Sequence, residues 1–171
     1  MTKRLLTTAL ILMTFPSSGM AQSKESLVGT WKLVSMTNLT DKGEVGEASV
    51  RHPSGLLTYT ADGRMMALVT AEGRKPLSNF PPASLASAEE RAEAFSTFVA
   101  YAGSYTVTGD KVILHIEVAW AQNLVNTDQV RSVKLQGDRL TLRGGRFVGR
   151  GGSVLNRELV WERMKSQTTD K

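Results

Sequence analysis

The sequence has 171 residues, a formal net charge of +5 and no cysteine. The lack of thiols excludes disulfides, thiol catalysis and cysteine-based zinc sites, so the core has to hold without covalent cross-links. Two of the cations, Lys3 and Arg4, lie at the extreme N-terminus, and without them the charge is only +3, which indicates solubility rather than a nucleic-acid-binding surface.

Residues 1–21 predict a secretory signal peptide. Lys3 and Arg4 precede an apolar run over 5–15, and small residues stand at the positions typical of cleavage after Ala21. The run is shorter than the roughly 20 residues that a membrane-spanning helix requires, and no second run of that length follows. We therefore expect a periplasmic or secreted protein without stable membrane insertion.

The rest of the chain has the size of one domain. We expect this domain over 27–164, between a polar lead-in over 22–26 and a polar tail over 165–171. Within it, Asp62-Gly63 separates two β-rich runs. This pair predicts a tight hairpin, because glycine accepts the positive φ that the turn requires.

A single helix is expected in the middle of the domain. It follows an irregular, proline-containing segment over 71–86, which we interpret as a lid or a long surface loop. Ser87 and Glu90 fit a helix-capping box, and apolar residues then recur at helical spacing. The pattern predicts a helix over about 88–102 that ends at Gly103 and lies against the strands or plugs one end of them.

Roughly eight short strands with turn residues between them predict an antiparallel barrel or sandwich. Alternation places His115 and Glu117 on one face of a strand. The opposite face of that strand is an unbroken apolar row that we expect to point inward: Val112, Leu114, Ile116, Val118 and Trp120.

Gln129 and Arg131 continue an inward-facing apolar row on the next strand. In a closed barrel, this gradient predicts a packed floor and a polar mouth. A guanidinium at such a mouth has to meet an anionic or carbonyl-bearing ligand, or else form an internal ion pair with Glu117 or Asp128.

Three interpretations of His115 and Glu117 stay open: an outward-facing pair, a catalytic or ligand-contacting pair, and metal ligands. Metal is the weakest, because His52 is the one other histidine and zinc normally takes three or four protein ligands. We expect no metal and no other cofactor. The glycine- and arginine-rich segment over 143–152 has an RNA-binding composition, but we interpret it as a flexible rim loop and expect no nucleic-acid partner.

Gly29-Thr30-Trp31 opens the first strand, and Arg163 closes the last. We expect the Arg163 guanidinium to pack over the Trp31 indole and to close one end of the barrel. This pattern resembles the lipocalin signature, and the chain is similar to the bacterial and fungal lipocalin-like domain family, although relatives often have a histidine where this chain has Leu114. The resemblance implies an all-β, eight-stranded antiparallel barrel with an inner cavity. It extends over these further stretches: 27–35, 55–65, 98–105, 115–117, Asn123, 129–131 and 137–142.

We therefore expect an exported barrel that binds a small, mostly apolar ligand with a polar or anionic end. Arg131 and Gln129 would hold that end. One alternative is an isomerase or cyclase acting on a small hydrophobic metabolite, with His115 or Glu117 in the lumen as the acid–base group. Another is an envelope or stress protein whose barrel is filled and holds no ligand. The further ligand-binding candidates are Trp120, Asn123, Tyr59, Tyr101 and Tyr105.

Overall fold

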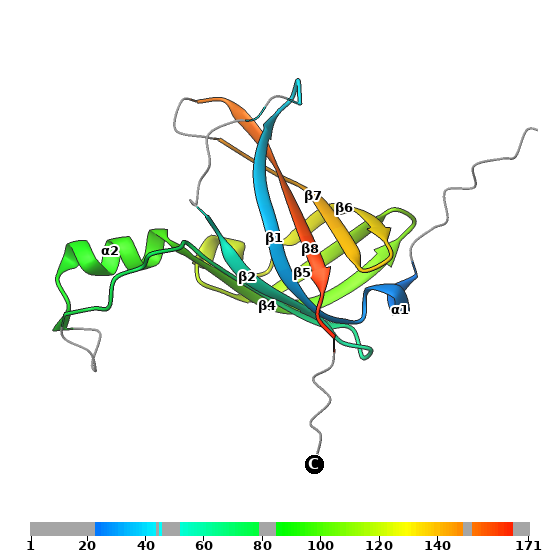
Figure 1. Cartoon of the computed structure of the whole chain (residues 1–171), viewed down its shortest axis with the longest axis horizontal. Helices are drawn as coiled ribbons and strands as arrows, with labels where there is room; N and C mark the ends of the chain where they lie inside the picture. Colours follow the sequence, from blue (N-terminus) through cyan, green and yellow to red (C-terminus); the bar gives the residue numbers. More distant parts are fainter. Residues whose placement is uncertain (1–22, 44, 46–51, 79–84, 149–151, 166–171) are drawn as a thin grey trace, which may run out of the picture.

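The computed structural model describes residues 23–43, 45, 52–78, 85–148 and 152–165. Eight antiparallel strands pair in sequential order and close into one barrel (Figure 1), which confirms the expected all-β fold. The expected signal peptide and nearly all of the polar tail lie outside the described residues. The strands are β1 Gly29–Thr40, β2 Ser54–Tyr59, β3 Arg64–Thr70, β4 Phe98–Thr108, β5 Lys111–Ala119, β6 Asp128–Gln136, β7 Arg139–Val148 and β8 Val154–Arg163.

One end of the barrel is closed by a short helix and a stacked pair of side chains. The lead-in forms helix α1, Lys24–Leu27, and Leu27 is fully buried. The indole of Trp31 donates to the Leu27 carbonyl over 2.9 Å, and the Arg163 guanidinium lies 4.0 Å from the centre of the Trp31 ring. The predicted pairing of Trp31 with Arg163 is therefore confirmed.

The predicted hairpin forms between β2 and β3. Gly63 has φ +93°, and its N–H donates to the Thr60 carbonyl over 3.1 Å. Tyr59 then pairs with Met65 across the two strands. No helix among the described residues is long and apolar enough to cross a bilayer.

The helix α2 is shorter than its periodicity predicts. Its capping box is present at Ser87 and Glu90, but the helix spans only Ala88–Ser96, and β4 begins at Phe98. Residues 98–104 pair in register with β3 instead. Long-range pairing of this aromatic and β-branched run outweighs a helical spacing that only local propensity supports.

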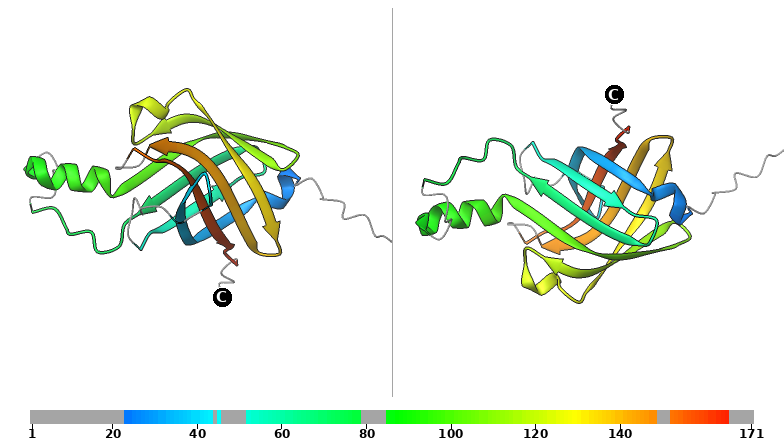
Figure 2. Two further views of the ribbon diagram at one scale, coloured as in Figure 1. Left: turned by 90° about the horizontal axis from the view of Figure 1, so that it is seen from above. Right: turned by 90° about the horizontal axis from the view of Figure 1, so that it is seen from below.

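Helix α2 also neither covers nor plugs the barrel. It extends away from the strands with the segment 71–78 beside it (Figure 2), and it buries none of its residues. Arg74 of that segment donates to the Ala94 carbonyl over 3.2 Å and lies 5.5 Å from the centre of the Phe98 ring. The two elements therefore form an arm that projects from the barrel.

A β-bulge interrupts the apolar row expected on β5. The register against β4 shifts so that Ile116 pairs with Gly103 but Val118 pairs with Ala102, which leaves Glu117 as the extra residue. Val118 consequently points outward, with 67% of its surface exposed, while Ala119 packs against the core. The unbroken inward row was thus a wrong prediction at Val118, because alternation cannot continue through a bulge.

Candidate functional site

The barrel contains a cavity of about 330 Å³. Residues of β1 and of β3 through β8 line it, together with Trp120 and the one-turn helix η2, Gln122–Leu124. Most of the lining is apolar or aromatic, and four polar side chains interrupt it: Gln129, Arg131, Arg146 and Arg157.

Polar and apolar lining residues occupy different levels of the barrel. Along β8, Arg157 is followed by Leu159 and Trp161, which line the cavity, and then by Arg163 at the closed end. Along this strand the arginine that lines the cavity therefore lies nearer the open end, and Leu159 and Trp161 lie nearer the floor. This is the arrangement that the sequence gradient predicts.

Four of the expected site residues line this cavity: Gln129, Arg131, Trp120 and Tyr101. Two others lie beneath it, where Tyr59 and Tyr105 pack with ring centres 4.6 Å apart. Both are buried, and neither belongs to the cavity lining.

The remaining candidate, Asn123, is exposed on η2, and its neighbour Leu124 reaches the cavity instead. The turn therefore contributes an apolar contact and not the expected amide.

Sequence reasoning missed two of the cavity arginines. Arg157 alternates with Leu159 and Trp161, so the inward row of β8 could have revealed it. Arg146 lies in the segment interpreted as a rim loop, but residues 143–148 belong to β7. The rim-loop interpretation therefore does not hold for 143–148, and residues 149–151 lie outside the described residues.

The three arginines differ in their partners. Arg146 lies 3.4 Å from the Asp41 carboxylate in an exposed pair at the rim. Arg157 donates from Nε to Asn38 over 3.3 Å. Burial, and then the neighbouring charge of Arg131, lower the pKa of the Arg157 guanidinium. This cluster of like charges favours an anion.

Arg131 borders the cavity with few partners of its own. Its Nη1 donates to the Val130 carbonyl over 3.0 Å. No ion pair joins it to a carboxylate of the described residues, and none of those residues that line the cavity is an aspartate or glutamate. Glu117 pairs with Arg64 and Asp128 pairs with His115, so the alternative of an internal ion pair between Arg131 and either carboxylate is wrong.

His115 and Glu117 lie on the outer surface of the barrel. The Nδ1 atom of His115 is 2.7 Å from Asp128, and Glu117 accepts two hydrogen bonds of 2.7 Å from Arg64. These bonds, with the charge of Arg64, lower the pKa of the Glu117 carboxyl. Neither residue reaches the cavity, and the described residues contain no cluster of three potential metal ligands.

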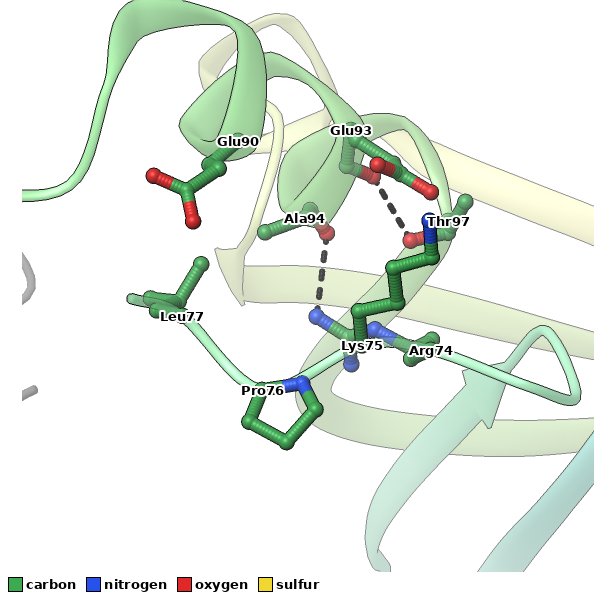
Figure 3. Close-up of a pocket in the computed structure, with 8 residues that line it drawn as sticks. All are labelled: Arg74, Lys75, Pro76, Leu77, Glu90, Glu93, Ala94 and Thr97. Carbon is green, nitrogen blue, oxygen red and sulfur yellow. Dashed lines mark hydrogen bonds between the residues drawn. The ribbon is translucent and has the colours of Figure 1, made fainter. Parts of the chain in front are cut away.

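A second hollow of about 230 Å³ lies between α2 and the segment 74–77, outside the barrel. Figure 3 shows Arg74 on one side of this hollow, where it donates to the Ala94 carbonyl of the helix. Glu90 accepts hydrogen bonds from Ser87 and Ser78, which lower the pKa of its carboxyl. The polar groups around this second hollow thus bond to one another and hold the arm together. The barrel cavity is therefore the better candidate site.

The fold and the cavity define a small closed antiparallel barrel with an internal site. A family model described as a lipocalin-like domain matches residues 28–164, and the chain belongs to this family. Among solved structures, the crystal structure of rhizavidin matches with 9% identity and a TM-score of 0.32, covering 86% of this chain and 91% of that chain. No curated protein matches the sequence.

Proposed function

We propose that this protein is an exported lipocalin-like barrel that binds a small, mostly apolar ligand with an anionic end. The observation that carries the proposal is Arg131, which borders an apolar cavity and has no carboxylate partner among the described residues. A guanidinium has five N–H donors, so one backbone hydrogen bond leaves most of them for a ligand.

The lining supports a ligand of modest size. Pockets for small molecules usually measure about 300–1,000 Å³, and this cavity, at about 330 Å³, lies at the lower end. Trp120, Trp161 and Leu159 offer an apolar surface to the body of the ligand, while Arg131 and Gln129 offer donors to its head. A short acyl chain or a single ring system that carries a carboxylate meets both requirements.

The two alternatives receive less support. An isomerase or cyclase acting through His115 or Glu117 needs one of them in the lumen, but on the outer surface Glu117 pairs with Arg64 and His115 is hydrogen-bonded to Asp128. A barrel filled by its own side chains would leave no internal cavity, whereas the barrel of this protein contains a cavity of about 330 Å³. Binding is the function that the geometry supports best.

Export rests on the N-terminal pattern of a charged end, an apolar run and small residues before position 22. Expression of the full chain in a bacterium should yield a periplasmic or secreted product that begins at Gln22. A product that keeps Met1 and stays in the cytoplasm would contradict export without affecting the binding proposal.

Binding is best tested with a matched pair of probes, octanoate and octanol, by isothermal titration calorimetry. Octanoate should bind at least about tenfold more tightly, because charge-assisted hydrogen bonds are worth about 1.5–3 kcal/mol. Substitution of Arg131→Met should remove this preference, whereas Arg139→Met, at an exposed arginine of β7, should leave it.

Native mass spectrometry with lipid and metabolite extracts extends the test beyond these probes. We expect a bound acid that is lost in the Arg131→Met variant. The proposal fails if no extract yields a ligand and Arg131→Met changes only stability.

A further inference from the structure

Arg131 and Arg157 lie on either side of a glycine. In the sheet register, Gly144 of β7 pairs with Arg131 of β6 on one side and with Arg157 of β8 on the other. Residues paired across antiparallel strands present their side chains on the same face. Gly144, at the centre of the row Arg131–Gly144–Arg157, has no side chain. No side chain of β7 at this position therefore fills the space between the two arginines.

The next residue, Gly145, lies directly against the Arg131 guanidinium and lines the cavity. A Cβ atom at position 145 would lie 2.9 Å from Nη2 of Arg131 and 3.0 Å from both Cζ and Nη1. These distances are shorter than van der Waals contact. The register of β7 against β8 also shifts between Gly144 and Phe147, as at a β-bulge, a feature that re-aims backbone and side chains.

We infer that Gly145 is a positioning residue for the bound ligand. Because Gly145 has no side chain, the Arg131 guanidinium can occupy the space beside it at the edge of the cavity. The inference rests on the proposed function, since it assigns Gly145 to anion binding through Arg131.

Adding a methyl group at Gly145 should displace the guanidinium more than it disturbs the barrel. The atoms that the methyl group would meet belong to the far end of a flexible side chain, which yields by changing rotamer. The guanidinium would then leave the position from which it donates to an anion. An alanine here should therefore weaken the binding of acids selectively.

Gly152 offers a closely matched control. Its φ of +76° nearly equals the +78° of Gly145, so alanine meets the same left-handed backbone strain at both positions. Among the described residues, however, no heavy atom beyond the chain neighbours of Gly152 lies within 4 Å of a Cβ atom built there. The two variants differ in whether the new methyl group reaches Arg131.

The experiment compares Gly145→Ala with Gly152→Ala by calorimetry with octanoate and octanol, and by thermal unfolding. We expect Gly145→Ala to weaken octanoate binding about tenfold or more and octanol binding less than about twofold, as loss of a charge-assisted contact would. Gly152→Ala should change neither affinity, and the melting temperatures should fall equally. In an Arg131→Met background, Gly145→Ala should have no further effect on octanoate.

Three results would overturn the inference. If the wild-type protein does not prefer octanoate to octanol, the proposed function fails and takes the role of Gly145 with it. If the wild-type protein prefers octanoate but the two alanine variants bind it equally, only the role of Gly145 fails. If Gly145→Ala unfolds while Gly152→Ala stays folded, the glycine serves the barrel itself and not the position of Arg131.

Discussion

Two arginines in the same barrel show how differently one side chain can be used. At the closed end, the guanidinium of Arg163 covers the Trp31 ring and donates to the carbonyls of Val28 and Ser26 over 2.6 and 2.7 Å. Its Nε also lies 3.4 Å from the Asp138 carboxylate. Stacking and hydrogen bonding thus engage the whole group, which makes it part of the closure of the barrel.

Near the open end, Arg131 lies beside a cavity and donates to one backbone carbonyl, that of Val130. Its neighbour on the far side of Gly144 is another cation, Arg157. The difference teaches that the number and kind of its partners indicate whether an arginine inside a barrel is structural or available to a ligand. Removing Arg163 should cost stability, whereas removing Arg131 should cost affinity.

The largest expected effect is that of Arg163→Ala on stability. The change removes two charge-assisted hydrogen bonds and a cation–π contact, and we expect a loss of about 3 kcal/mol in the free energy of unfolding. For a chain of this size, that corresponds to a fall of about 10 °C in melting temperature. Octanoate affinity should stay within about twofold of wild type, because Arg163 does not line the cavity.

The control for this prediction is Arg139→Ala, which removes an exposed arginine from β7. It should shift the melting temperature far less than Arg163→Ala does. If Arg163→Ala lost as much free energy of octanoate binding as free energy of unfolding, the two ends of the barrel would not have separate roles.

A smaller effect is expected from the two tyrosines beneath the cavity. The Tyr105 hydroxyl donates to the Thr60 carbonyl over 3.0 Å, so Tyr105→Phe should cost about 1 kcal/mol. The Tyr59 hydroxyl is buried with no hydrogen-bond partner among the described residues, and burial raises its pKa. Tyr59→Phe should therefore leave stability unchanged or raise it by about 1 kcal/mol.

Urea unfolding of the two phenylalanine variants measures this contrast. If Tyr59→Phe loses as much as Tyr105→Phe, the Tyr59 hydroxyl has a partner such as a buried water. Polar groups accessible to water would then extend beneath the apolar floor of the cavity.

The smallest expected effect is that of Arg131→Met on the ligand-free protein. The charge of Arg131 contributes to the lowered pKa of Arg157, which means that the two cations disfavour each other. Removing Arg131 should leave stability unchanged or raise it by about 0.5 kcal/mol. Thermal unfolding without ligand tests this, and any gain should shrink as salt screens the repulsion.

A loss of stability in Arg131→Met as large as that in Arg163→Ala would contradict the comparison. Arg131 would then stabilise the barrel itself. Weaker octanoate binding by the Arg131→Met variant could no longer be assigned to a missing contact with the ligand.

Local patterns in the sequence determined much of this protein. The alternation around Arg131 predicted that it faces inward, Gly63 predicted the hairpin, and Ser87 with Glu90 predicted the start of α2. These three features depend on strand periodicity and on turn and cap chemistry, which act over a few residues. The pairing of Trp31 with Arg163, which are far apart in the sequence, was implied by the resemblance to the lipocalin signature.

Only the tertiary structure decided the features that depend on long-range strand pairing. Pairing with β3 ends α2 at Ser96, and the bulge at Glu117 turns Val118 outward. The sheet register also brings Arg157 and Gly145 to Arg131, from strands that the sequence does not align. Backbone pairing between distant segments sets these contacts, and no pattern within one strand encodes its neighbour's register.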